Sequence, residues 1–412
     1  MRLLLVQNSV YVPTHGGANK GNRLMMEALA ARGHECHVVA QGAAVQGAVS
    51  RESFLRELDT RRIPLLRSTP LVDVFELAGV EVQATRTPAH LRRSVADAIH
   101  ALDPRWILVA SEDPGQNLLL SSLAARADRV MLLARTTLAL PFGPDVAMPN
   151  QDATRRLADA AGIVCVSRFL KEYVERWSGY PAEHLPLSYF GDGPFPSFAD
   201  PSRGFVTMFN PCAVKGIAIF LALAKAHPGV SFAAVPSWGT TSDDVKSLEA
   251  LPNVRLLPAR DDVEAILAQT RVLLMPSLWI EAGGRSVTEA MLRGIPVVAS
   301  AVGGLPEVKV GVPYVLPVRP IEAYGPRLDE KMLPVANVPV QDIGVWSEAL
   351  LALADPVHYR TISSASRDAA HAFLKINTID PLERFLLARA DEERQPIRVR
   401  SFAASPTSPP RS

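Results

Sequence analysis

The chain alternates short apolar runs with helix-like segments, and this alternation limits the possible folds more than any other feature. Apolar runs at residues 106–110, 130–134 and 162–167 in the first half are bounded by turn residues and predict strands. The opening residues predict a strand, a glycine-bearing loop, a helix and a strand. Strands that alternate with helices predict a parallel sheet covered by helices on both faces.

The same alternation begins again after residue 204. Strands are expected at 204–210, 230–236, 271–277 and 296–300, and helices at 217–226, 261–269 and 285–294. Because the pattern occurs twice, we predict an α/β protein with two Rossmann-like domains. The length of 412 residues also favours two domains, so the cleft between them is the first place to look for a site.

Changes in composition predict the domain boundaries. Residues 191–204 are rich in proline and glycine and lack periodicity, which indicates a connection between domains. We therefore predict an N-terminal domain, a linker, a C-terminal domain, a helical segment and a disordered, proline-rich tail. Their predicted ranges are 1–193, 194–204, 205–355, 356–390 and 391–412.

Charge, hydropathy and cysteine usage exclude several classes of protein. The 43 basic and 42 acidic side chains leave a net charge of +1, which predicts neither a nucleic-acid partner nor a basic membrane patch. No uncharged apolar run reaches the roughly 18 residues of a membrane span, and the opening apolar run is too short for a signal peptide. The cysteines Cys36, Cys165 and Cys212 lie far apart without a Cys-x-x-Cys spacing, so we expect a reducing, cytoplasmic environment.

Two glutamates, Glu281 and Glu289, flank the glycine pair Gly283 and Gly284 directly after the expected strand 271–277. Open α/β sheets bind ligands at this end of their strands. The glycines allow close approach of the backbone, and the helix start offers free N–H groups to a ligand. Carboxylates repel phosphate, so they would face neutral hydroxyl groups, which sugars supply. A structural alternative is that Ser286 caps the helix and Glu289 completes a capping box.

The stretch PSLWIEAGGRSVTEAMLRGIPVVASAVGGLPE, residues 276–307, resembles the signature of group 1 glycosyltransferases, the large family 4 of retaining enzymes with an E-x7-E motif. The resemblance implies the GT-B type fold, two Rossmann-like domains facing a cleft, with helices 356–390 returning towards the N-terminal domain. It also implies that Glu281 lies against the hydroxyls of the donor sugar, whereas Glu289 holds the ribose of the nucleotide. Gly283, Gly284 and Ser286 would bind the donor at the helix start.

A second segment, NPCAVKG, is similar to the Arg-x4-Lys-Gly element of this family, whose cations grip the diphosphate. Lys215 matches the lysine, but Asn210 occupies the arginine position. A charge-assisted hydrogen bond contributes about 1.5–3 kcal/mol, so its loss must be offset or accepted. Arg285 is a candidate substitute; the alternative is a solvated arginine at the start of a helix.

Further segments match the family with different strength. The loop THGGANKGN resembles its amino-terminal glycine loop, with Gly16 and Gly17 as the matched residues. NVRLLPARDDVEAIL looks like the segment whose backbone meets the nucleotide base, which places Leu257 and Pro258 near the base.

One departure from the family pattern concerns the first domain. Many members carry a histidine that approaches the donor sugar, but residues 134–150 contain none. Arg135, at the expected end of a strand, is a candidate for the role of this histidine. The alternative is that Arg135 only caps the strand end. Glu112 or Asp113 could contact an acceptor hydroxyl or start the next helix.

The resemblance implies a metal-independent hexosyltransferase (EC 2.4) that uses a nucleotide-diphosphate-sugar donor and an acceptor hydroxyl, without a cofactor. Glu281, Lys215 and Arg135 are its candidate catalytic residues. A composition rich in arginine, alanine and proline is consistent with a high-GC bacterium, for which we expect a secondary metabolite or a cell-envelope glycan as acceptor. The alternatives are a non-catalytic nucleotide-sugar-binding protein of the same fold, and an epimerase or phosphorylase.

Overall fold

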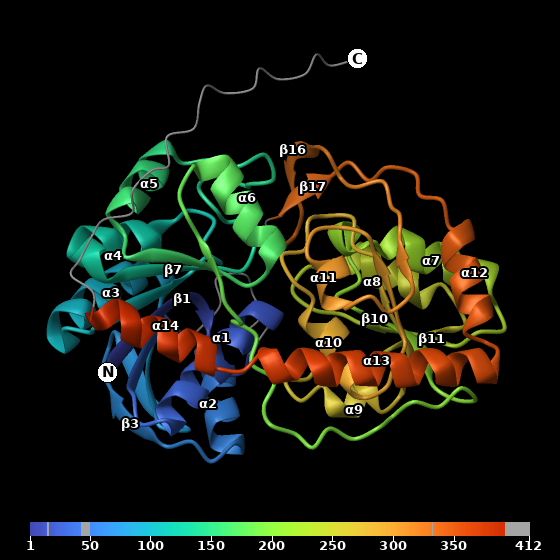
Figure 1. Ribbon diagram of the computed structural model, residues 1–412, viewed down its shortest axis with the longest axis horizontal. Helices are drawn as coiled ribbons and strands as arrows, with labels where there is room; N and C mark the ends of the chain where they lie inside the picture. Colours follow the sequence, from blue (N-terminus) through green and yellow to red (C-terminus); the bar gives the residue numbers. More distant parts are fainter. Residues whose placement is uncertain (15, 43–49, 332, 392–412) are drawn as a thin grey trace.

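The computed structural model describes residues 1–14, 16–42, 50–331 and 333–391, which form two α/β domains (Figure 1). The first sheet has the strand order β3-β4-β5-β2-β1-β6-β7-β8-β9. Its strands are β1 (Arg2–Val10), β2 (Glu35–Gln41), β3 (Leu65–Ser68), β4 (Val72–Leu77), β5 (Val80–Thr85), β6 (Trp106–Ala110), β7 (Val130–Ala134), β8 (Gly162–Cys165) and β9 (Glu183–His184). Neighbouring strands are parallel, except that β3 and β4 add an antiparallel edge beside β5.

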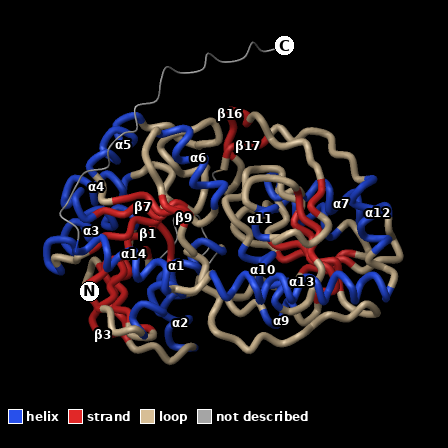
Figure 2. Tube along the Cα trace, in the orientation of Figure 1, coloured by secondary structure: helices blue, strands red, loops and turns tan. Residues whose placement is uncertain are grey.

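Helices cover both faces of this sheet, as Figure 2 shows. They include α1 (Gly17–Ala31), α2 (Arg51–Thr60), α3 (Pro88–Leu102), α4 (Asn117–Arg126), α5 (Gln151–Arg156) and α6 (Arg168–Ser178). The burial of β1 reflects this arrangement, because Leu3 and Leu5 belong to one hydrophobic cluster and Leu4 and Val6 to another. Successive side chains of a strand point to opposite faces, so a continuous apolar run is buried on both sides.

The second sheet has the order β12-β11-β10-β13-β14-β15, and all of its neighbouring strands are parallel. Its strands are β10 (Phe205–Phe209), β11 (Phe232–Val235), β12 (Val254–Leu256), β13 (Thr270–Met275), β14 (Val297–Ser300) and β15 (Val315–Leu316). The chain builds outward from β10 in one direction and from β13 in the other. The strand order therefore reverses between β10 and β13, which is where such sheets bind ligands.

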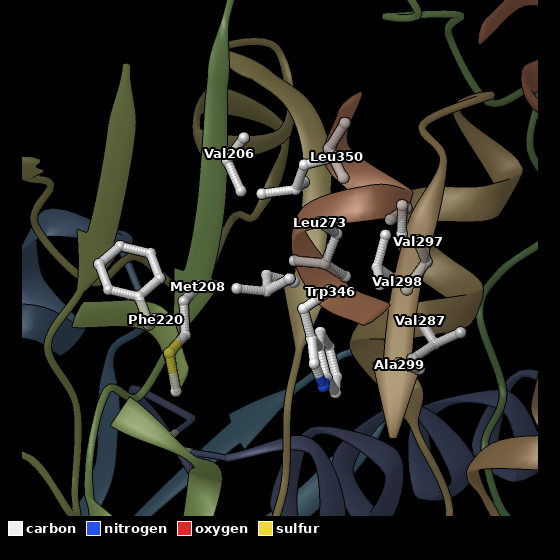
Figure 3. Packing of buried hydrophobic residues seen from close by; sticks show 14 of the residues in the cluster. Val206, Met208, Phe220, Leu273, Val287, Val297, Val298, Ala299, Trp346 and Leu350 are labelled. Atoms are coloured by element: carbon white, nitrogen blue, oxygen red, sulfur yellow. The ribbon is translucent and has the colours of Figure 1, made fainter. Parts of the chain in front are cut away.

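The helices of this domain are α7 (Ile217–Ala226), α8 (Ser242–Glu249), α9 (Glu264–Leu267), α10 (Arg285–Leu292), α11 (Leu305–Val308) and α12 (Gly344–Ala352). Figure 3 shows part of the core, in which Met208, Leu273 and Val298 come from neighbouring strands and Trp346 from α12. A hairpin of β16 (Tyr324–Leu328) and β17 (Pro334–Ala336) is a separate antiparallel sheet. The sequence reading did not predict this hairpin.

The helix expected at 261–269 is much shorter than predicted, because α9 is limited to residues 264–267. The reason is tertiary. The carboxylate of Asp261 pairs with Arg23 and Arg61 of the first domain, which draws the start of the segment out of a helix.

The connection between the sheets and the C-terminal helices join the two domains. Residues 185–204, all of which the structure describes, contain no helix or strand, and Phe195 and Phe198 pack against the core of the second domain. Helix α13 (Pro356–Ile376) runs along the second domain, and α14 (Asp380–Asp391) returns to the first (Figure 1). There, the Trp106 indole N–H donates to Leu386 O at 3.0 Å.

The remainder of the predicted tail, residues 392–412, lies outside the described residues. Among the residues that the structure describes, no helix has the length and apolar composition needed to cross a membrane.

Candidate active site

The candidate site lies where the strand order of the second sheet reverses. Lys215 lies in a short turn after β10, and Glu281 in the loop after β13. Gly216 adopts a φ of +84°, and a Cβ at this position would lie only 1.9 Å from Pro276 O. Only glycine combines this conformation with such a close approach, and the crossing of the two loops brings Lys215 next to Glu281.

The carboxylate of Glu281 is held by three donors on one oxygen. Its Oε1 accepts from Ser277 Oγ at 2.6 Å and from the indole Nε1 of Trp279 at 2.9 Å, and it pairs with Lys215 Nζ at 2.5 Å. The residue is only 8% exposed. The Lys215 amine also lies 4.7 Å from the ring centroid of Trp279, within the range of a cation–π contact. These contacts leave the other oxygen, Oε2, as the one available to a ligand hydroxyl.

The backbone of Glu281 is held as firmly as its side chain. The N–H of Gly304 donates to Glu281 O at 2.7 Å. A Cβ at Gly303, where φ is +53°, would lie 2.0 Å from the same oxygen. The second glycine pair of the sequence, Gly303–Gly304, therefore positions the first glutamate rather than forming a site of its own.

Helix α10 begins at Arg285 with Gly284 as its N-cap, and no side chain bonds to the cap. The alternative reading of Ser286 as N-cap with Glu289 as capping-box partner is wrong. A Cβ at Gly284 would lie 2.9 Å from atoms of Leu305 and Val308, so the close packing of α11 sets the helix start. Ser286 lies inside the helix, with its hydroxyl 3.8 Å from the sulfur of Met275.

Glu289 lies on α10 and is 7% exposed. Its Oε1 accepts from Arg285 Nε at 2.9 Å, and Lys20 Nζ of α1 lies 3.8 Å away. Lys20 is thus a cation from the first domain that faces the predicted ribose-binding glutamate. The sequence reading missed it.

Arg285 is not a solvated arginine, because its side chain is 7% exposed. Its Nη1 donates to Tyr189 O at 2.7 Å, and its guanidinium lies 4.5 Å from the ring centroid of Phe190. Burial lowers the pKa of Arg285, and the carboxylate of Glu289 acts in the opposite direction. These partners tie α10 to the connection between the domains, so a phosphate would have to share this guanidinium with them.

Asn210 holds a loop through its side chain. Its backbone is left-handed, with a φ of +52°, and its Oδ1 accepts from Gly239 N at 2.9 Å and from Thr240 Oγ1 at 3.4 Å. The other side-chain atom, Nδ2, is buried without a partner among the described residues. The loop after β11 is therefore fixed from the position where the resembled family has an arginine.

The glycine loop of the first domain faces the start of α10. Gly16 is the N-cap of α1, with a φ of +83° and no described atom within 4 Å of a Cβ placed there. A Cβ at Gly17 would lie 3.2 Å from the Cβ of Arg285. A Cβ at Gly283 would approach only Val166 of the first domain, at 3.9 Å, among the described residues. The amino ends of α1 and α10 therefore meet where the two domains contact each other, and both ends favour an anion.

The segment predicted to meet the base follows β12. Leu257 is buried, and its N–H donates to Ala234 O at 2.9 Å, whereas Pro258 is exposed. Further along, Asp261 pairs with Arg23 at 2.8 Å and with Arg61 at 3.0 Å. Burial by itself raises the pKa of Asp261, but these arginines hold it below its usual value. The segment is thus docked onto the first domain.

Arg135 follows β7 and is 7% exposed. Its Nη1 would lie 2.8 Å from a Cβ placed at Gly21, so the guanidinium packs against α1. Burial lowers the pKa of Arg135 to about 10, although the carboxylate of Glu112 opposes this shift. Both carboxylate oxygens of Glu112 are buried without a hydrogen-bond partner among the described residues, and burial raises the pKa of this group. Asp113 accepts from Leu118 N at 2.8 Å and so supports the start of α4.

Together, the glutamates, Lys215 and the two helix ends form one polar site, whereas Arg135 packs against Gly21 and Met25 of α1. The sequence reading missed Ser277, Trp279 and Lys20 as members of this site. Their signals were local: Ser277 and Trp279 precede Glu281 by four and two residues, and Lys20 lies in the segment predicted as the glycine loop, which the structure shows as the first turn of α1.

Solved structures with the same architecture define the class of fold. Sucrose-phosphate synthase from Thermosynechococcus elongatus is 17% identical, with a TM-score of 0.65 over 94% of this chain and 99% of that one. Anabaena HepE, in complex with UDP and glucose, is 19% identical, with a TM-score of 0.62 over 94% and 100%. A mutant of S. aureus TarM, in complex with fondaparinux, alpha-GlcNAc-glycerol and UDP, is 9% identical, with a TM-score of 0.63 over 95% and 100%. These likenesses confirm the predicted fold of two Rossmann-like domains, the GT-B type.

The second domain identifies the kind of protein more closely. Residues 202–324 match the family described as Glycosyl transferases group 1, and this segment contains Lys215, Glu281 and Glu289. No curated protein matches the sequence. The second domain is therefore a group 1 glycosyltransferase domain, and the chain is accordingly a glycosyltransferase.

Proposed function

We propose that the protein is a retaining glycosyltransferase of family 4, with Glu281 and Glu289 as its E-x7-E pair. It transfers a hexose from a nucleotide-diphosphate-sugar to an acceptor hydroxyl and needs no metal ion. The observation that carries this proposal is the Lys215–Glu281 pair at the reversal of strand order, beside the amino ends of α1 and α10. A lysine and backbone N–H groups suit a diphosphate, and a fixed carboxylate suits sugar hydroxyls.

In this reaction, the bond between the anomeric carbon and the diphosphate oxygen breaks, and the oxygen keeps the electron pair. Lys215 and the N–H groups at the start of α10 would meet the growing negative charge, as preorganised electrostatic stabilisation. The acceptor oxygen forms the new bond to the anomeric carbon, and its proton passes to the leaving diphosphate. Oε2 of Glu281 would orient the sugar through a hydroxyl, and Glu289 would hold the ribose.

The diphosphate would meet fewer fixed cations than the motif of the resembled family supplies, because Asn210 is neutral and bound to the 237–240 loop. We propose that Lys20 and Arg285 supply positive charge on the other side of the donor, since both contact Glu289. Arg135 stays a candidate on the acceptor side, where its guanidinium remains charged at neutral pH. The acceptor itself, a bacterial secondary metabolite or a cell-envelope glycan, and the cytoplasmic location stay predictions from composition and cysteine usage.

The test is to incubate the protein with a panel of nucleotide sugars and candidate acceptors, and to measure release of nucleoside diphosphate with and without EDTA. Turnover that EDTA leaves unchanged supports the proposal, and proton NMR of the product reports whether the anomeric configuration is kept. Binding of nucleotide sugars without turnover for any acceptor would instead favour a non-catalytic binding protein of the same fold.

A further inference from the structure

We propose that the exposed ring of Trp238 is a binding platform for the sugar ring of the donor. This inference rests on the proposed function and deepens it, because it assigns a residue that recognises the sugar rather than the nucleotide. Trp238 lies in the loop after β11 and is 39% exposed, at the same edge of the sheet as Lys215 and Glu281.

The loop that carries Trp238 is held in place by hydrogen bonds and by close packing. Asn210 Oδ1 accepts from Gly239 N at 2.9 Å, and Ser237 N donates to Thr240 Oγ1 at 3.1 Å. A Cβ at Gly239 would lie 2.9 Å from the sulfur of Cys212, so the loop packs tightly on the turn that leads to Lys215. An exposed tryptophan on a loop with these anchors is a preformed surface rather than a mobile side chain.

Trp238 is also connected to the reactive centre through a second tryptophan. The rings of Trp238 and Trp279 lie 5.9 Å apart between centroids with an interplanar angle of 36°. Trp279 in turn donates its indole N–H to Glu281 and carries the Lys215 amine near its ring. Both Lys215 and Trp238 therefore contact Trp279, and Trp238 is the more exposed of the two tryptophans.

We assign this surface to a sugar ring rather than to a nucleotide base. One side of a pyranose presents C–H groups that pack on an aromatic ring, while its hydroxyls bond to a carboxylate such as Glu281. The predicted base segment, Leu257–Pro258, follows β12, and the Trp238 loop follows the neighbouring strand β11. Trp238 is linked through Trp279 to Glu281, the carboxylate that is proposed to bind the sugar hydroxyls.

The experiment compares the affinities for a nucleotide sugar and for its nucleoside diphosphate by isothermal titration calorimetry. UDP-glucose with UDP and GDP-mannose with GDP serve as probes, and the pair that the parent protein binds is used for the variants. The variants are Trp238→Ala and Trp238→Phe. Trp177→Ala is the matched control, because Trp177 of α6 is 44% exposed and also packs against an aromatic ring, Tyr173.

We expect Trp238→Ala to weaken binding of the nucleotide sugar by about twofold to twelvefold, since an aromatic contact contributes about 0.5–1.5 kcal/mol. Binding of the nucleoside diphosphate should be unchanged, which also shows that the variant is folded. Trp238→Phe should keep most of the affinity, and Trp177→Ala should match the parent.

Two results for the variants would overturn the inference while leaving the proposed function intact. One is equal affinity of Trp238→Ala and the parent for the nucleotide sugar. The other is an equal loss for the sugar nucleotide and the diphosphate, which would place Trp238 against the base. A parent that binds no nucleotide sugar would overturn the proposed function, and this inference with it.

Discussion

Lys309 gives the protein a defined dependence of stability on pH. It follows α11, which packs on the start of α10, and its side chain is completely buried. Its Nζ donates to Val297 O at 2.6 Å, and no carboxylate pairs with it among the described residues. Burial lowers the pKa of Lys309 from 10.5 to about 7. Above pH 7, the folded protein therefore releases this proton, whereas the unfolded chain keeps it up to about pH 10.5.

The size of the effect follows from these two pKa values. Their difference of about 3.5 corresponds to about 5 kcal/mol that opposes folding. This opposition is fully present below pH 7, because both states are then protonated and the folded state buries a charge. It shrinks as the pH rises from 7 to 10.5. The free energy of unfolding of the parent therefore gains a contribution that increases with pH across this window.

We expect Lys309→Met to raise the free energy of unfolding at pH 7. Methionine keeps the length of the side chain without the charge, but Val297 O loses its donor, at a cost of about 1–3 kcal/mol. The net gain at pH 7 is then about 2–4 kcal/mol, and at pH 9.5 the advantage of the variant should largely disappear.

Urea denaturation of the parent and the variant at pH 6.5, 8 and 9.5 measures this difference. Because the free energies of unfolding of the two proteins are subtracted at each pH, the contributions of the other titrating groups cancel. Lys225→Met, at an exposed lysine of α7, is the control and should differ little from the parent at each pH. A Lys309→Met variant that is less stable at pH 7, or a difference that stays constant with pH, would refute the reasoning.

Three further predictions concern the site. In a thermal-shift assay, Glu289→Ala should lose the stabilisation that nucleoside diphosphates confer. Glu281→Ala should keep this stabilisation but lose sugar transfer in an activity assay. If both variants behaved like the parent in both assays, the site would be misplaced. Trp279→Phe keeps the ring but removes the N–H donor to Glu281, so kcat should fall about tenfold with little change in KM, and unchanged steady-state kinetics would contradict this positioning role. Gly216→Ala should lower the melting temperature strongly, because its Cβ would overlap Pro276 O; a variant that melts like the parent would disprove the close contact.

The site was predictable where its geometry depends on neighbouring residues in the chain. Glu281, Glu289 and the glycines between them form one loop and one helix, so their arrangement follows from a short segment. The capping role of Ser286 failed for the opposite reason. A good N-cap residue was present, but the packing of α11 against Gly284 moved the helix start to Arg285.

The alternation of strands and helices determined two parallel sheets, since a continuous apolar strand must be buried on both faces. This reasoning did not predict the antiparallel strands β3 and β4 or the hairpin β16–β17. They extend or flank the parallel sheets without following the alternation of strands and helices. The short length of α9 was not predicted either, because it depends on the contact of Asp261 with Arg23, 238 positions away in the sequence.

By itself, the sequence determined the fold class and the segments that carry the candidate site, because strand burial and glycine geometry are local properties. Only the tertiary structure decided which charges meet. Arg285 reaches Tyr189 O, 96 positions away, and Trp238 packs against Trp279 on another loop. Contacts of this kind depend on how two sheet edges and two domains are placed in space, and no local pattern encodes that placement.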